Sequence, residues 1–250
     1  MRIVVIGGTG LVGSKLVQQL KNAGHWVIAA SRATGVDIVT GEGLSQTLRG
    51  ADVVVDLSNP GYGEVASMRR FFKISTGQLL AAEHQARIRH HVVFSAIGVG
   101  HVSSGYYRAK SAQEAMITAS MVPFTIVRSA PLFEYIYDLV DADRSAKIVR
   151  VPPIRVQPIA GDDAARLLLE MAIRPPANEI IEISGPISYR LLDLAGQILT
   201  ANEDDRSVMI DGNAPFFGTH LNGELPVGDR PGHIGATSFD NWLRRSLVPA

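Results

Sequence analysis

The chain opens with Ile3-Val4-Val5-Ile6-Gly7-Gly8-Thr9-Gly10-Leu11-Val12-Gly13-Ser14-Lys15-Leu16, and its architecture can be inferred outward from this stretch. Four apolar residues come first and predict a buried strand. Glycines then recur at every third position, Gly7, Gly10 and Gly13, and a helical pattern of apolar residues follows at once. Strand, glycine turn and helix in this order predict the first βα unit of a fold that binds a dinucleotide.

Each of the three glycines has a physical role in such a turn. Gly7 permits a tight turn, Gly10 lets the backbone approach a pyrophosphate, and Gly13 lets the helix pack close to the strand. The free N–H groups at the start of that helix favour phosphate oxygens. A turn that merely packs tightly is the alternative, which three glycines at this spacing disfavour. The turn residues expected to bind the cofactor are Gly7, Thr9, Gly10, Leu11, Val12 and Gly13.

The composition is that of an ordinary globular protein. The chain has 250 residues, 46% of them hydrophobic, which is enough for a sizeable core. Because 24 basic residues balance 24 acidic ones, we expect neither nucleic acid nor a membrane as a partner. The chain has no cysteine, and its seven histidines show no metal-binding spacing, so we predict no metal site. We recognise no signal peptide or membrane span and expect a cytoplasmic protein, monomeric or homodimeric, with a small-molecule substrate.

Strands and helices alternate along the chain up to about residue 128, which predicts an α/β fold with a parallel sheet. The expected strands lie at residues 3–6, 26–30, 36–39, 52–57, 91–94 and 124–128. Helices are expected at residues 10–23, 44–48, 64–89, 133–141, 162–173, 189–199 and 239–247, and another ends near residue 120. A glycine-rich stretch, residues 218–235, predicts a loop.

Residues beyond the strand ends are expected to meet the cofactor, because ligands of open α/β sheets collect at the carboxyl ends of the strands. Ser31 and Arg32 end the second strand, and no acidic residue lies between Gly24 and Val36. An arginine at this place accommodates the 2′-phosphate of NADP, so NADP is favoured over NAD. A solvated arginine at a strand end is the alternative.

Two further strand ends contribute candidates. Asp37, within the short strand predicted at 36–39, either meets the adenine or is a carboxylate that faces a turn. Leu57, Ser58 and Asn59 follow a run of valines that reads as a strand buried on both faces. These three residues are predicted to neighbour the cofactor by topology.

Tyr106 and Lys110 are four residues apart at the start of a predicted helix, so their side chains share a face. A tyrosine has a pKa near 10, and a nearby lysine ammonium favours the phenolate. Lowering that pKa by three units would need about 4 kcal/mol. The pair can exchange a proton with a carbinol oxygen while a hydride moves at the nicotinamide, and the lysine can also bind the ribose. His90 and His91, by contrast, are predicted to be packed or solvated.

The glycine turn and the stretch Tyr106-Tyr107-Arg108-Ala109-Lys110 resemble the short-chain dehydrogenase/reductase superfamily. The stretches 123–129 and 237–243 resemble its atypical, NmrA-like branch. This resemblance spans nearly the whole chain. It implies a Rossmann-like, doubly wound domain that binds NAD(P), residues 1–150, and a smaller C-terminal part, residues 151–250, that closes over the substrate.

The resemblance also implies roles for individual residues. Tyr106 is the catalytic tyrosine, Lys110 its partner, and Ser95 the serine that orients the substrate, with Ser103 or Ser104 as alternatives. The chain departs from the family pattern after Ser95, where residues 96–97 carry no hydroxyl. Tyr107 stays open as a second candidate because it lies three residues before the lysine.

Three functions are compatible with these features. The first is an NADPH-preferring oxidoreductase that acts on a small carbonyl or carbinol compound through Tyr106 and Lys110. The second is a sensor that binds NADP and catalyses nothing. The third is an epimerase or dehydratase that uses bound NAD transiently. Phe216 and Phe217, beside the glycine-rich loop, are either a lid over an apolar substrate or ordinary core.

Overall fold

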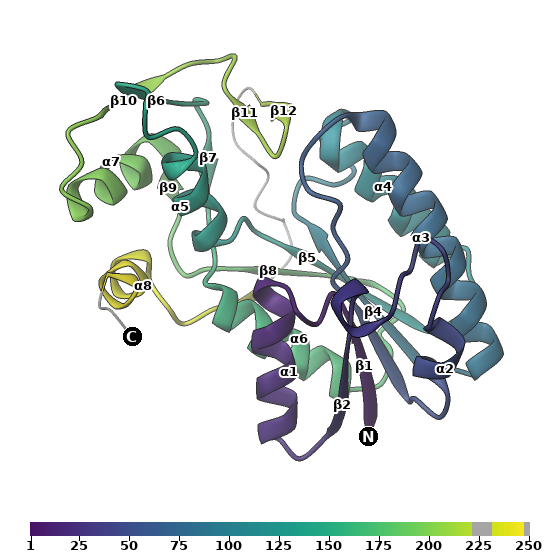
Figure 1. Cartoon of the computed structure of the whole chain (residues 1–250). Helices are drawn as coiled ribbons and strands as arrows, with labels where there is room; N and C mark the ends of the chain where they lie inside the picture. Colours follow the sequence, from purple (N-terminus) through teal and green to yellow (C-terminus); the bar gives the residue numbers. More distant parts are fainter. Residues whose placement is uncertain (222–231, 248–250) are drawn as a thin grey trace.

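The computed structural model describes residues 1–221 and 232–247 and shows a Rossmann-like α/β fold (Figure 1). Its main sheet has seven strands in the order β13-β8-β5-β4-β3-β1-β2, and every pairing is parallel. The predicted doubly wound parallel sheet is therefore confirmed. The strands of this sheet are β1 (Arg2–Ile6), β2 (Trp26–Ala30), β3 (Val53–Asp56), β4 (His90–Ala96), β5 (Phe124–Ser129), β8 (Ile180–Ser184) and β13 (His233–Ile234).

Helices cover both faces of the sheet because alternate strand residues point to opposite sides. Val53 and Val55 of β3 pack with α1 (Leu11–Asn22) and α6 (Gly161–Ile173). Val54, between them, packs on the other face with α2 (Leu44–Leu48) and α3 (Val65–Ala86). On that same face α4 (Gly105–Thr118) lies beside α3. In the described residues, no helix has both the length and the apolar character needed to cross a membrane.

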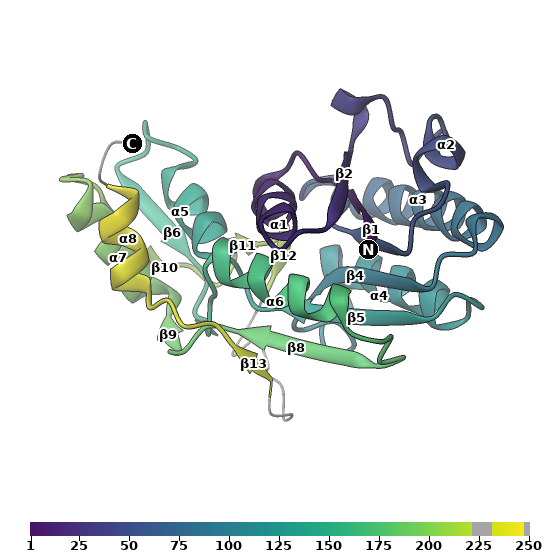
Figure 2. The same ribbon diagram turned by 90° about the horizontal axis from the view of Figure 1, so that it is seen from below.

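A smaller part lies at one end of the molecule, away from α2 and α3 (Figures 1 and 2). Its helices are α5 (Phe133–Asp141), α7 (Leu191–Ala201) and α8 (Phe239–Ser246). Its strands pair as β6 (Ile148–Val151) with β10 (Ser207–Ile210), β7 (Arg155–Val156) with β9 (Tyr189–Arg190), and β11 (Pro215–Phe216) with β12 (Thr219–His220). One apolar cluster joins this part to the main one, since Phe133 and Phe239 belong to the same cluster as Phe72 and Tyr107.

The predicted strand at residues 36–39 is wrong. After a short 3₁₀ turn, η1 (Arg32–Thr34), the chain runs through irregular turns. The Asp37 carboxylate accepts the backbone N–H of Val39 at 2.7 Å and that of Thr40 at 3.3 Å. A side chain that binds these N–H groups replaces the hydrogen bonds of a sheet ladder. Of the loop predicted at 218–235, residues 222–231 lie outside the described part of the chain. Its described ends are not loop throughout, because they contain β12 and β13, each paired with another strand.

Candidate active site

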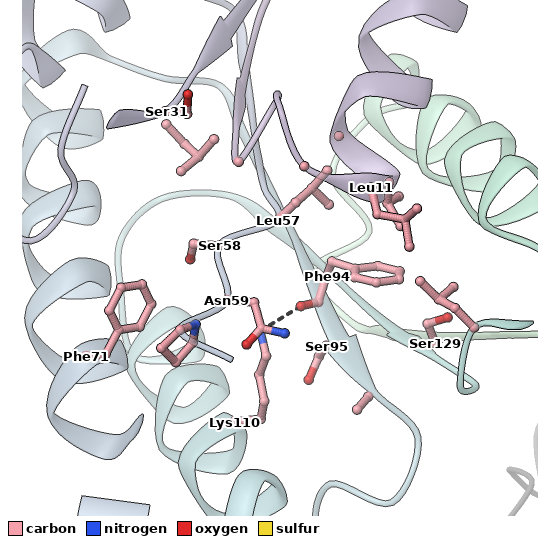
Figure 3. A pocket seen from close by; sticks show the side chains of 18 of the residues that line it. Leu11, Ser31, Leu57, Ser58, Asn59, Phe71, Phe94, Ser95, Lys110 and Ser129 are labelled. Carbon is pink, nitrogen blue, oxygen red and sulfur yellow. Dashed lines mark hydrogen bonds between the residues drawn. The ribbon is translucent and has the colours of Figure 1, made fainter. Parts of the chain in front are cut away.

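A cavity of about 820 Å³ lies at the carboxyl ends of the central strands, where β1 is flanked by β2 and β3. Because β2 lies on one side of β1 and β3 on the other, the strand order reverses here, and ligands of open sheets bind at such a reversal. Figure 3 shows side chains from several elements converging on it. The structure brings all the predicted site residues to this one cavity: Gly7, Thr9, Gly10, Leu11, Val12, Gly13, Ser31, Arg32, Asp37, Leu57, Ser58, Asn59, Ser95, Tyr106 and Lys110.

The glycine turn forms a cradle that side chains would fill. Gly7 has a φ of +73°, and a Cβ there would lie 3.0 Å from the carbonyl oxygen of Leu57. A Cβ at Gly13 would collide with the carbonyl oxygen of Gly7. Gly8, which our sequence analysis gave no role, is equally constrained, because a Cβ there would lie 2.8 Å from the carbonyl oxygen of Val5.

The N-terminus of α1 opens into this cradle without a cap of its own. Gly10 is its N-cap residue, no side chain caps its N–H groups, and its first turn has no acidic residue. Free N–H groups and the positive end of a helix dipole bind anions. The cradle therefore fits the pyrophosphate of a dinucleotide.

The far end of the cavity lies at the end of β2. Ser31 begins η1, and its backbone N–H donates to Oγ1 of Thr34 at 2.8 Å. Arg32 is exposed next to it and makes no ion pair within the described residues. Asp37 also lines the cavity, but its carboxylate faces a turn, which is the second of the two expectations.

Lys110 is fixed beneath the cavity by α4 and β4. Its Nζ donates to the carbonyl oxygen of Phe94 at 2.8 Å (Figure 3) and to Oε1 of Gln113 at 2.8 Å. The residue is 1% exposed, and burial lowers the pKa of its ammonium to about 8. The carboxylates of Asp56 and Glu114 oppose this shift.

Asp56, at the end of β3, completes this buried network. Its Oδ2 accepts from Nε2 of Gln113 at 3.1 Å, and its Oδ1 accepts the backbone N–H of Ser58 at 2.9 Å. One carboxylate thus connects the loop after β3 with the amide that holds Lys110. Neither Asp56 nor Gln113 was predicted as a site residue, although the three-residue spacing of Lys110 and Gln113 on a helix puts them on one face.

Tyr106 lies among aromatic rings and is 6% exposed. Its ring centroid is 5.1 Å from that of Tyr62, 5.7 Å from that of Phe217 and 6.1 Å from that of Tyr107. Burial raises the pKa of Tyr106 well above its usual value, and Tyr62, Tyr107 and Asp56 add to the shift. The expectation of a lowered pKa for Tyr106 is wrong, because burial among apolar rings disfavours the phenolate and raises the pKa.

Ser95 also lines the cavity, but its hydroxyl donates to Oε1 of Glu114 at 2.6 Å. Glu114 further accepts from Arg128 at 2.7 and 3.1 Å. Because the hydrogen of Ser95 is donated to this carboxylate, its oxygen can act toward a ligand only as an acceptor. The alternatives named from the sequence, Ser103, Ser104 and Tyr107, are not among the lining residues.

The two histidines are packed, as expected. Both lie buried in β4. Nδ1 of His91 is 2.8 Å from Oε1 of Glu83, and Nε2 of His90 is 2.8 Å from Oγ1 of Thr125. Neither imidazole is among the residues that line the cavity.

A model of a family described as NAD(P)H-binding matches residues 7–172, more than half of the chain. The chain belongs to this NAD(P)H-binding family. Among curated proteins, photosystem II assembly factor Ycf39 of Synechocystis sp. is 31% identical over 109 residues, which are 38% of this chain and 33% of that protein. The match thus spans about a third of that relative's length.

Solved structures share the fold of this NAD(P)H-binding protein. UDP-glucose 4-epimerase of Bifidobacterium longum, in complex with NAD+ and UDP, has a TM-score of 0.77 at 14% identity, over 99% of this chain and 97% of that one. dTDP-4-dehydrorhamnose reductase of Bacillus anthracis, in complex with NADP, has a TM-score of 0.73 at 14% identity, over 98% and 97% of the chains. The family model confirms the expected NAD(P) cofactor, and these solved structures share the Rossmann-like fold that the resemblance implies.

Three aromatic residues of the cavity escaped the sequence analysis or were left undecided by it. Tyr62 and Tyr135 were not named, and Phe217 was assigned either to a lid or to the core. All three line the cavity next to Tyr106. They lie far apart in the chain, in the loop after β3, in α5 and after β11, so no local pattern could have grouped them.

Proposed function

We propose that this NAD(P)H-binding protein is an NADPH-preferring oxidoreductase that reduces the carbonyl group of a small molecule. One observation carries the proposal: Tyr106 and Lys110 line the same cavity as the glycine cradle of Gly7 to Gly13. A phenol, an ammonium and a dinucleotide cradle in one cavity supply the parts that hydride transfer to a carbonyl needs.

The chain's own residues account for binding of the cofactor. The cradle and the N-terminus of α1 hold the pyrophosphate, Arg32 binds the 2′-phosphate, and Lys110 reaches the ribose next to the nicotinamide. When bound, NADPH supplies the hydride. Arg32 supports the preference for NADPH because its guanidinium is exposed beside the cavity and a planar fork of donors suits a phosphate.

Tyr106 acts as the general acid. Since its surroundings hold the pKa of the phenol well above the usual value, Tyr106 is protonated at neutral pH and can donate. Its Oη gives a proton to the carbonyl oxygen as that oxygen gains negative charge, so that the carbonyl becomes a carbinol. The ammonium of Lys110 favours the phenolate that is left, and the phenolate recovers a proton from solvent before the next cycle.

From the C-terminal residues 151–250, which are expected to close over the substrate, Phe217 lines the cavity in this proposal. It packs on Tyr135 of α5, which lines the same cavity. Ser95 stays a predicted contact to the substrate oxygen. In the geometry described above, it makes that contact only if its hydroxyl leaves Glu114.

Purified protein with NADPH and a panel of aldehydes and ketones tests the proposal by the loss of absorbance at the nicotinamide wavelength. Tyr106→Phe is expected to lower kcat by at least about 100-fold while NADPH still binds. Tyr107→Phe is the matched control, because the neighbouring hydroxyl is buried, unpartnered and outside the cavity. Equal turnover in the wild type and Tyr106→Phe would exclude Tyr106 as the acid.

A protein that binds NADP and regulates a partner is the second candidate. Two observations favour it: Tyr62 covers Tyr106, and Glu114 engages the hydroxyl of Ser95. This function predicts NADP binding by calorimetry with no turnover on any carbonyl compound. NAD that co-purifies without net consumption would instead indicate an epimerase or dehydratase.

A further inference from the structure

Three aromatic side chains form a cage at the substrate end of the cavity. The aromatic cage consists of Tyr106, Tyr135 and Phe217, which come from α4, from α5 and from the turn after β11. The rings of Tyr135 and Phe217 are stacked, with centroids 4.1 Å apart and planes at 26°. The backbone N–H of Phe217 also donates to Oη of Tyr135 at 2.7 Å. These contacts fix the walls of the cage relative to one another.

The cage already holds one six-membered ring, that of Tyr62. Its centroid lies 5.1 Å from the ring of Tyr106, 5.2 Å from that of Tyr135 and 4.8 Å from that of Phe217. Aromatic pairs attract at such separations when the rings are edge-on or tilted. The space between the three walls is therefore the size of a phenyl ring, and its lining suits one.

Tyr62 is the replaceable member of this group. It sits in the loop after β3 and is 41% exposed, whereas Tyr106 is 6% exposed. Glycines flank it on both sides, and neither Gly61 nor Gly63 would bring a Cβ within 4 Å of another part of the structure. The two glycines leave the backbone free to rotate, so Tyr62 can swing out at the cost of its hydrogen bond with Asn59 and its ring contacts, which the incoming ring replaces.

The charges around the cavity narrow the choice of ligand. Among the described residues that line it, the cationic ones are Arg32 and Lys110. Arg32 follows β2 at the opposite end, and Lys110 donates two of its three hydrogens to Phe94 and Gln113 and the third, in the proposed function, to the ribose. Within the described lining, the aromatic cage thus offers no cation to a diphosphate, and an uncharged ring fits it better.

We infer that the aromatic cage binds the substrate, a carbonyl compound with a planar six-membered ring, and that this ring takes the place of Tyr62. The inference rests on the proposed function, since it places the carbonyl beside the hydroxyl of Tyr106. It adds the substrate class, aryl ketones and aldehydes or cyclic enones and diones, in place of open-chain or nucleoside diphosphate compounds.

Calorimetric titration of the NADP+-saturated protein tests this without turnover, because NADP+ cannot reduce a ketone. The probes are acetophenone and cyclohexyl methyl ketone, which differ in the planarity of the ring. Acetophenone is expected to bind at least about tenfold more tightly, with an upfield shift of its ring protons in NMR. Equal affinities for the two ketones would overturn the inference.

Two variants test the exchange with Tyr62. Tyr62→Ala is expected to bind acetophenone several-fold more tightly, because no ring has to be displaced, and Tyr62→Phe is the control that keeps the ring. Weaker binding by Tyr62→Ala would show that Tyr62 packs on the ligand, which contradicts the exchange. Phe217→Leu is expected to lose at least about tenfold in acetophenone affinity. If this buried substitution prevents folding, the Tyr62→Ala variant, at an exposed position, still tests the inference.

These titrations, combined with the turnover assay of the proposed function, separate the two proposals. If NADP+ binds and NADPH reduces open-chain ketones, but acetophenone has no advantage, the inference fails and the proposed function stands. If NADP+ binds and no carbonyl compound is reduced, while acetophenone still binds in the cage, the proposed function fails. UDP-glucose is a third probe. Tight binding of UDP-glucose would contradict the conclusion that the aromatic cage has no cation for a diphosphate.

Discussion

The Nζ of Lys110 lies 2.8 Å from Oε1 of Gln113, and the amide nitrogen of Gln113 donates in turn to Asp56. The amide of Gln113 therefore orients the ammonium of Lys110, and the carboxylate of Asp56 orients that amide. Two of its three hydrogens are engaged by Gln113 and Phe94, which leaves one donor for the cavity. Asp56 is thus a positioning residue for Lys110, in addition to favouring its charge.

The first prediction concerns pH. Burial lowers the pKa of Lys110 to about 8, so kcat/KM for NADPH, which reports the free enzyme, is expected to fall as the pH rises through about 8. The Asp56 carboxylate raises this pKa, so Asp56→Asn is expected to move the decline to lower pH. Steady-state kinetics from pH 6 to 10 measure this decline in kcat/KM for the wild type and for Asp56→Asn. Asp193→Asn, at an exposed carboxylate paired with Arg190, is the control, and coincident profiles would rule out the role of Asp56.

The second prediction concerns Ser95. Because its hydrogen is donated to Glu114, Ser95→Ala is expected to lower kcat by less than about tenfold. The measurement is kcat for the best carbonyl substrate at saturating NADPH. A loss of more than about 100-fold would show that Ser95 turns toward the substrate during the reaction, as the family resemblance implies.

The third prediction concerns stability. Glu83 and His91 form a fully buried pair between α3 and β4. Burial alone would lower the pKa of His91, but the carboxylate and hydrogen bond of Glu83 outweigh burial and raise it. Glu83→Leu is expected to lower the free energy of unfolding by about 3–5 kcal/mol at pH 6, since it leaves His91 buried without a partner. Urea unfolding measures this.

The double variant Glu83→Leu, His91→Leu is the control for that experiment. Replacing both partners with apolar residues is expected to restore most of the loss. Because the pKa of His91 is raised, its contribution in the wild type is complete below pH 6.5 and declines as the pH rises through the raised value. A double variant as unstable as the single one would contradict this account.

The fourth prediction concerns the choice of cofactor. Arg32→Ala is expected to weaken NADP binding by about 10–100-fold and to leave the Kd for NAD unchanged, because in the proposed function the arginine binds the 2′-phosphate, which NAD lacks. Calorimetry with both dinucleotides measures the two constants. Arg49→Ala, an exposed arginine outside the cavity, is the control. Equal weakening of both cofactors would show that Arg32 does not select NADP.

Local patterns predicted the parts of the structure that depend on neighbouring residues. The strand, glycine turn and helix at residues 3–16 are where the sequence placed them, and the helix predicted at 133–141 has those bounds. Tyr106 and Lys110 share the cavity because a four-residue spacing on a helix fixes a common face. The strand predicted at 36–39 failed because the carboxylate of Asp37 competes for the backbone N–H groups.

The chemistry of the site depends on contacts that the sequence does not bring together. The pKa of Tyr106 is raised because its ring is buried among rings of distant segments, and the lysine four residues away does not set the sign of this shift. The partner of Ser95 is Glu114, and the charge of Lys110, on α4, is favoured by Asp56 at the end of β3. Such contacts arise because α4 packs against β4 and β5 while its Gln113 reaches Asp56 at the end of β3, which no periodicity reveals.

Transfer of deuterium tests the central claim most directly. The protein is incubated with NADPH that carries deuterium at C4 of the nicotinamide and with acetophenone, and the product alcohol is analysed by mass spectrometry and NMR. We predict deuterium at the carbinol carbon with the wild type and Tyr107→Phe, and at least about 100-fold less with Tyr106→Phe at saturating cofactor. A protein that binds NADPH but yields no deuterated alcohol from any ketone or aldehyde would contradict the account.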